Sequence, residues 1–124
     1  MNWTATGALL MALAVAIGAF GAHGLKGRLD AYSMSVYEKA VFYHFVHALG
    51  ILFVALLART GAINATTQNR GAGLLLMGIV LFSGSLYALA ISGVRVLGAV
   101  TPFGGLAFIA GWLYLVYAAV RKTL

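Results

Sequence analysis

Three histidines are the side chains of this sequence best suited to bind a metal ion or a haem. His44 and His47 are three residues apart, so on a helix they share one face, and Tyr43 lies four residues before His47. His23 lies in a separate apolar segment. Because histidine is a common ligand of metal ions and haem, one interpretation is a site that joins His23 to His44 or His47. The other is hydrogen bonding between helices, or snorkelling to the interface, with no metal and no cofactor. We favour it because His23 lies near the membrane surface, about 10 Å in depth from His47, and because the three- or four-ligand pattern of a zinc site is missing.

Two serines, Ser83 and Ser85, lie deep in another apolar segment. They could line a water path or contact a ligand, but serines in membrane helices more often bond a helix carbonyl or a neighbouring helix. We predict that His47 faces the interior of a helical bundle and bonds Ser83, or Ser85 if that helix is rotated the other way. The candidate polar or ligand-binding cluster consists of His23, Tyr43, His44, His47, Ser83 and Ser85.

Enzyme chemistry has little support in the sequence. The only acidic residues are Asp30 and Glu38, and both lie at the edge of an apolar segment. Ser83 with His47 would make a dyad without an orienting acid, so we expect no catalytic residue. Coupled transport usually places carboxylates within the spans, which argues against a proton-driven pump. The absence of cysteine excludes disulfides, iron–sulfur clusters and thiolate metal sites.

The composition indicates that the elements positioning these side chains are membrane-spanning segments. Of the 124 residues, 63% are hydrophobic and 8% are charged, and the mean hydropathy is +1.01. A soluble domain of this length would carry about a quarter charged residues, so lipid is the solvent that fits this surface. The net charge of +6 comes from basic residues between apolar runs. There they flank membrane spans, and we expect the lipid bilayer and not nucleic acid as the partner.

Four stretches without charged residues are long enough to cross a hydrocarbon core of about 30 Å as helices. We therefore predict an all-α, integral membrane four-helix bundle with both termini on the same side, built as a single domain over residues 1–124. Ser35 and Glu38 form a capping box that would start the second helix, and Thr101 with Pro102 would start the fourth. The segment from Arg59 to Arg70 should be an aqueous loop. The predicted spans are roughly 3–25, 36–58, 71–92 and 101–120.

Small residues recur every four positions along the predicted helices, which lets helix backbones approach closely in lipid. We favour packing within one bundle over a seam between subunits. The residues assigned to helix packing are Gly18, Ala22, Gly84, Ala88, Gly104, Gly105 and Gly111.

Four ordered motifs carry a resemblance to a known family. They begin at Gly18 (GAFGAHGLK), Tyr43 (YHFVHAL), Leu81 (LFSGSLY) and Val100 (VTPFGG, running on to Gly111-Trp112). Together they resemble the YgdD/YwdK-like family of small four-helix bacterial inner-membrane proteins, a domain of unknown function. The resemblance implies a multi-pass protein of the cell (inner) membrane and brings no catalytic residue.

Basic residues are divided equally between the two membrane faces, four against four, so the positive-inside rule is silent. Members of the family often end in a basic tail, as Arg121-Lys122 does here, and this predicts termini in the cytoplasm.

Two classes of function remain after these exclusions. The first is a structural, accessory or interaction protein that assembles with a membrane-protein partner or as a homo-oligomer. The alternative is a binding or conducting module for a lipid, quinone, haem or small solute. We favour the first, because small-residue packing faces are abundant and reactive groups are few.

Overall fold

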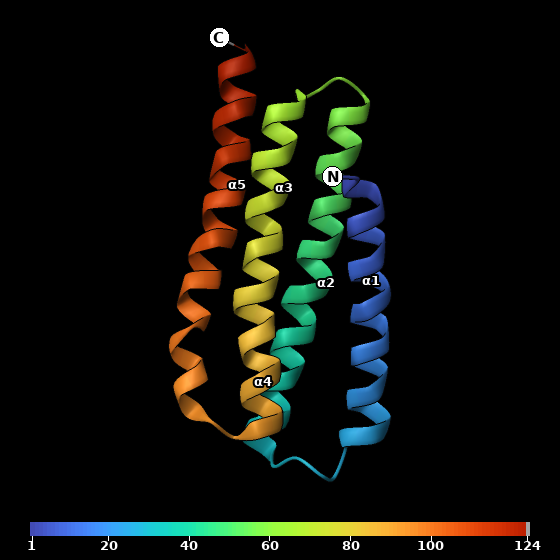
Figure 1. Cartoon of the computed structure of the whole chain (residues 1–124), viewed down its shortest axis with the longest axis vertical. Coiled ribbons are helices and arrows are strands. Elements are labelled where there is room, and N and C mark those ends of the chain that lie inside the picture. Colours follow the sequence, from blue (N-terminus) through green and yellow to red (C-terminus); the bar gives the residue numbers. More distant parts are fainter. Residues whose placement is uncertain (124) are drawn as a thin grey trace.

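The computed structural model describes the backbone of residues 1–123 and the side chains of residues 1–121. The side chain of Lys122, half of the basic tail, lies outside this part. Within it, four helical spans are long and apolar enough to cross a membrane, and none of its residues is in a strand. The predicted all-α membrane fold is thus confirmed, and both termini lie at the same end of the molecule (Figure 1).

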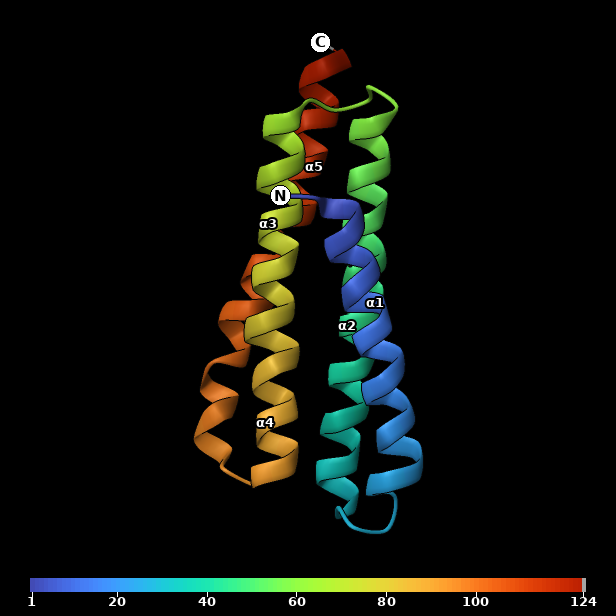
Figure 2. The ribbon, with the colours of Figure 1, turned by 45° about the vertical axis from the view of Figure 1, so that its right-hand side comes forward.

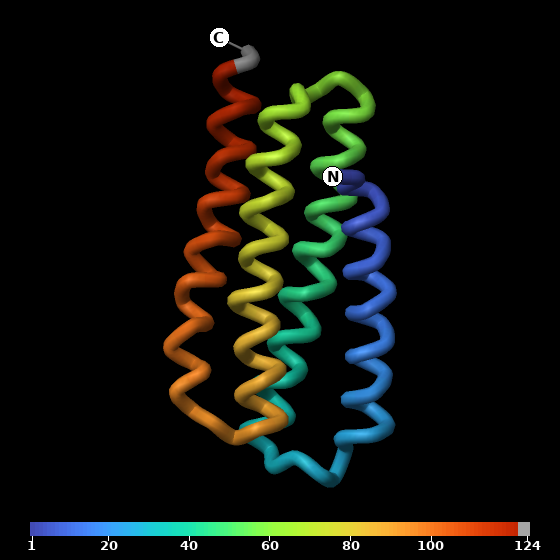
Figure 3. The backbone as a smooth tube through the Cα atoms, in the orientation of Figure 1, coloured from blue at the N-terminus to red at the C-terminus, as the bar shows by residue number. Residues whose placement is uncertain are grey.

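The four spans are assembled from eight helical segments, which Figure 3 traces along the chain. Two spans contain a π-helical turn, in which the backbone bonds skip one residue more than in an α-helix. The first span is α1 (Trp3–Phe20) with the π-helix η1 (Gly21–Leu25), the second is α2 (Ala31–Arg59), the third is α3 (Ala65–Gly78) with the π-helix η2 (Ile79–Ser83) and α4 (Gly84–Ser92), and the fourth is α5 (Thr101–Thr123), preceded by the 3₁₀ helix η3 (Arg95–Ala99).

The second and third spans form the centre of the bundle, with α1 against α2 on one side and α5 against α3 on the other (Figures 1 and 2). In the most apolar 18 residues of each span, 44% of the residues are buried in the second and third spans, against 17% in the first and 22% in the fourth. Most side chains of α1 and α5 therefore face outward, where lipid or a partner must cover them.

The second helix starts at Ala31, not at Ser35. The Asp30 carboxylate accepts the backbone N–H of Ser33 at 2.7 Å, and this bond lowers the pKa of Asp30. The Ser35 hydroxyl donates instead to the Tyr32 carbonyl at 2.7 Å, so the predicted capping box is wrong. An aspartate one turn earlier caps the helix as well as a serine does, and it adds a full negative charge at the helix N-terminus.

The third span also starts earlier than expected. Asn64 accepts the backbone N–H of Thr67 at 2.8 Å, and the helix begins at Ala65, although its first two turns are polar. The aqueous loop predicted from Arg59 to Arg70 therefore shrinks to residues 60–64. The predicted start of the last span at Thr101 is confirmed.

α5 closely approaches the π-helical turn η2 of the third span. A Cβ atom added to Gly104 would overlap the backbone nitrogen of Phe82. Further along the same contact, a Cβ on Gly78 would overlap the ring of Phe108, and one on Gly111 would lie 2.9 Å from Leu75. The fourth span thus packs on the third with no side chain between the two backbones at Gly104.

We expect Gly104→Ala to destabilise the protein by about 1–3 kcal/mol, because the methyl group must push α5 away from the Phe82 backbone. Gly105→Ala is the matched control, since its Cβ would lie 3.9 Å from the nearest atom, in the Phe82 ring. That change should be neutral, or stabilising by up to about 1 kcal/mol through helix propensity. Denaturant unfolding in detergent measures both, and equal stability of the two variants would contradict the close contact.

Candidate functional site

A chain of polar aromatic side chains crosses the bundle and links three spans. Nδ1 of His44 in α2 lies 2.8 Å from the hydroxyl of Tyr87 in α4. The ring of Tyr87 lies 5.5 Å from that of Tyr37, centroid to centroid, and the Tyr37 hydroxyl donates to the carbonyl of Ile17 in α1. These contacts tie the second span to the third and to the first.

His44 is 3% exposed, and its Nε2 has no hydrogen-bond partner. It is the single buried side-chain nitrogen or oxygen in this condition among the described residues. The backbone of Leu10 in α1 is close enough to interact with the ring electrostatically. A buried nitrogen without a partner lowers the stability of the protein by about 1–3 kcal/mol. His44 is therefore the most unusual polar group of the interior.

His47 faces the interior, as predicted, and is 5% exposed. Its Nδ1 lies 2.8 Å from the carbonyl oxygen of Tyr43 on the same helix, so Nδ1 is the donor of this bond. The ring stacks on Phe108 with the centroids 3.5 Å apart and lies 5.8 Å from the ring of Trp112. The predicted bond to Ser83 or Ser85 is wrong, because a backbone carbonyl one turn away already holds the imidazole.

Both serines bond across helices, but not to a histidine. The fully buried Ser83 hydroxyl donates to the carbonyl of Ala40 in α2 at 2.8 Å. The Ser85 hydroxyl donates to the Phe82 carbonyl at 3.0 Å and lies 2.6 Å from the hydroxyl of Thr101 in α5. The serines therefore join the third span to the second and to the fourth.

The six predicted cluster residues do not form one site. Tyr43, His44, His47, Ser83 and Ser85 share the interior, and the Tyr43 ring lies 4.5 Å from that of Phe82. His23 is exposed in η1 and joins none of them. Among the described residues, no three His, Cys, Asp or Glu lie together as ligands for a metal ion.

The aromatic partners of the two interior histidines were not predicted from the sequence. Tyr37 precedes His44 by seven residues, two helical turns, so the shared face was visible in the spacing. Phe108 and Trp112 follow the glycines of α5 and could be placed only once the rotation of α5 against α2 was known. The sequence alone therefore carried no signal for Phe108 and Trp112.

The small residues assigned to packing behave differently from one another. Gly104 and Gly111 meet neighbouring helices closely, as described above, and Gly105 lies farther from its nearest atom. A Cβ on Gly18 would lie 3.3 Å from Val41 of α2. Gly84 would meet nothing closer than 4.0 Å, and Ala22 and Ala88 are exposed, so these three lie outside the close helix contacts.

The outer face of α1 carries a stripe of small residues that the bundle does not cover. At about 100° per residue these residues fall within an arc of about 80°, nearly opposite to the buried face formed by Trp3, Gly7 and Ala14. We call this set the alanine stripe; it consists of the exposed residues Ala5, Ala8, Ala12, Ala16 and Ala19.

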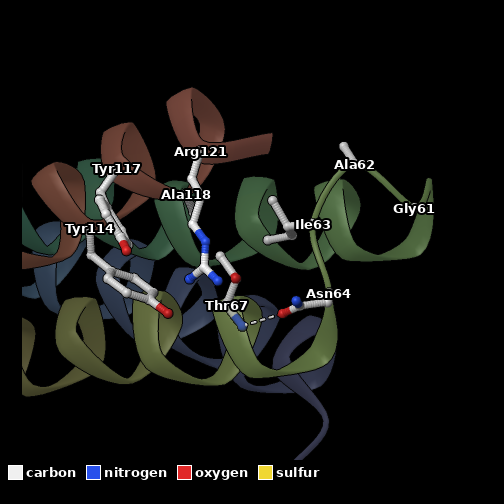
Figure 4. Close-up of a pocket in the computed structure, with 9 residues that line it drawn as sticks. All are labelled: Gly61, Ala62, Ile63, Asn64, Thr67, Tyr114, Tyr117, Ala118 and Arg121. Carbon is white, nitrogen blue, oxygen red and sulfur yellow. Dashed lines mark hydrogen bonds between the residues drawn. The ribbon is translucent and has the colours of Figure 1, made fainter. Parts of the chain in front are cut away.

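A pocket of about 620 Å³ opens at the end of the bundle that carries both termini (Figure 4). It lies between the loop that joins α2 to α3, the first turn of α3 and the last turns of α5. Its polar side chains come from Asn64, Thr67, Tyr114, Tyr117 and Arg121.

Comparison with known proteins gives a consistent result. The model of a family described as a protein of unknown function, DUF423, matches residues 17–105. The UPF0382 membrane protein YwdK of Bacillus subtilis is 48% identical over 117 residues, 93% of this chain and 93% of its own. A UPF0382 membrane protein of Staphylococcus epidermidis is 51% identical over 115 residues, 93% of this chain and 92% of its own. No solved structure matches the chain.

We expect Tyr87→Phe to destabilise the protein by about 1–3 kcal/mol, because both ring nitrogens of His44 would then be buried without a partner. His44→Leu should destabilise as well, since it leaves the Tyr87 hydroxyl unpaired. The double variant should lose less than the sum of the two, by about 0.5–3 kcal/mol, as for any directly bonded pair.

The control for this cycle is Tyr32→Phe, which removes the same hydroxyl from a half-exposed tyrosine. Its stability in detergent should stay within about 0.5 kcal/mol of the parent. Additive losses in the double variant would contradict the bond between His44 and Tyr87.

Proposed function

Because the chain belongs to the DUF423 family of membrane proteins of unknown function, we propose a role that its surface supports, that of a non-catalytic accessory protein which packs against a partner helix through α1. The relatives are bacterial, and we propose the cell (inner) membrane as its location. The basic tail that includes Arg121 supports termini in the cytoplasm.

The observation that carries this proposal is the alanine stripe. Helices in lipid have no hydrophobic drive to associate, so they associate where small residues let their backbones approach and pack. The five alanines of the stripe face away from the bundle, whereas the exposed face of α5 carries large side chains such as Leu106, Ile109 and Leu113. A helix face made of small side chains makes few contacts with lipid chains, and it lets the backbone of a second helix pack closely against it.

The interior supports the same role. The hydroxyls of Tyr37, Ser83 and Ser85 bond backbone carbonyls, and Nδ1 of His47 does so too. The bonds of Tyr37 and Ser83 join neighbouring helices, and those of Ser85 and His47 stay within one span. Groups engaged in this way have little reactivity left for substrate chemistry. We infer that the polar residues of the spans serve the architecture that presents α1.

The simplest partner is a second copy of the chain. Copies inserted in the same orientation would meet across a two-fold axis, with equal residues at equal depth. Ala12 is the middle residue of the alanine stripe and lies nine residues after the start of α1. It should therefore lie close to Ala12 of the second copy.

Single-cysteine variants test the proposal without background, because the chain has no cysteine. Ala12→Cys should form a disulfide-linked dimer on oxidation in native membranes. If the partner is another protein, a benzophenone coupled to the same cysteine should give a heavier adduct on illumination. Either product supports an interaction role.

The matched control is Ala110→Cys, an exposed alanine near the middle of α5, as Ala12 is near the middle of the first span, and therefore at a similar depth. It should give neither product. Labelling of lipid alone at position 12, or equal products at positions 12 and 110, would contradict the proposal.

A further inference from the structure

The pocket at the terminal end of the bundle is built from three separate elements. Arg121 reaches over it from the last turns of α5, and Thr67 faces it from the first turns of α3 (Figure 4). Asn64 closes one side, where its side chain accepts the backbone N–H of Thr67 at 2.8 Å. Tyr114 and Tyr117 form the opposite wall, with their ring centroids 6.4 Å apart.

Thr67 is the informative residue of this pocket. The residue is 8% exposed, and in Figure 4 its side chain points into the space between α3 and α5. Its hydroxyl is not among the buried side-chain atoms that lack a partner, so it is open to the pocket. A group that enters the pocket from outside can therefore bond this hydroxyl.

The charge of the pocket selects the class of that group. Arg121 supplies a permanent cation, and the same end of the bundle carries Arg59, the last residue of α2, and Arg70, in the first two turns of α3. The two acidic residues, Asp30 and Glu38, lie at the other end of α2, with Glu38 about 30 Å from Arg59 along the helix at 1.5 Å per residue. The pocket also opens at the start of α3, where the helix dipole favours an anion.

The depth of the pocket in the membrane further limits which anionic group can enter it. Arg121 lies 20 residues after Thr101, or about 30 Å along α5, which equals the thickness of the hydrocarbon core. Tyr114 and Tyr117 lie where tyrosines mark the boundary between hydrocarbon and headgroups. If Thr101 marks one edge of the hydrocarbon core, the guanidinium of Arg121 reaches the level of the lipid phosphates at the other edge.

We propose that this pocket binds the phosphate group of an anionic phospholipid, held by the Arg121 guanidinium and the Thr67 hydroxyl, with the acyl chains running down the outer face of α5. Arginine pairs with a phosphate through two parallel N–H···O bonds, which suits a fixed headgroup site. The site is independent of the alanine stripe, which lies on the other flank of the bundle.

Native mass spectrometry of the purified protein, titrated with phosphatidylglycerol, tests the proposal. Arg121→Gln should weaken binding by about tenfold, the usual loss for one charge-assisted hydrogen bond, and Thr67→Val by about threefold. Arg70→Gln is the matched control, since it removes the same charge from an exposed position at the same end but outside the pocket. It should stay within about twofold of the parent.

Two further ligands distinguish the source of the phosphate. Phosphatidylcholine, which carries no net charge, should bind more weakly than phosphatidylglycerol, and inorganic phosphate should leave the thermal midpoint unchanged. If inorganic phosphate instead stabilises the parent protein but neither Arg121→Gln nor Thr67→Val, that result would support the phosphate site and assign it to a soluble phosphate ester. Equal losses in Arg121→Gln and Arg70→Gln, or no loss in Arg121→Gln, would overturn the proposal.

Discussion

The contact between Gly104 and the backbone of Phe82 is the constraint on which the rest of the bundle depends. It brings α5 against the π-helical turn of the third span with no side chain between the two backbones. From there Phe108, one turn further along α5, stacks on the ring of His47, and Thr101 meets Ser85. If α5 moved outward, the stacking and the hydroxyl contact would both be lost.

A lipid environment explains how the interior polar groups are arranged. Water is not available in the hydrocarbon core, so each buried donor must find an acceptor within the bundle. Ser83 finds the Ala40 carbonyl and His47 finds that of Tyr43, whereas His44 pairs one of its two nitrogens with Tyr87. The bonds of Ser83 and His44 connect helices, whereas that of His47 stays within α2, and together they account for these polar residues in the spans without a reaction at that place.

The sequence predicted the features that depend on composition, such as the number of spans, but it did not predict the contacts between helices. Runs without charge gave four spans, and Thr101 with Pro102 marked the start of α5. Asp30 and Ser35 are both good caps one turn apart, so pattern alone could not choose between them. The predicted bond from His47 to Ser83 was wrong. The depth of a residue in the membrane can be counted along the sequence, but the direction in which its side chain points depends on how each helix is rotated against its neighbours. The alanine stripe was present in the sequence, but only packing shows that it faces outward.

The central claim is that His47 belongs to a dry helix contact and not to a ligand site. The ¹⁵N chemical shifts of its ring in the lipid-reconstituted protein test this most directly. The hydrogen bond to the Tyr43 carbonyl predicts a single neutral form with the proton on Nδ1. A proton on Nε2, or a mixture of forms exchanging with water, would contradict it.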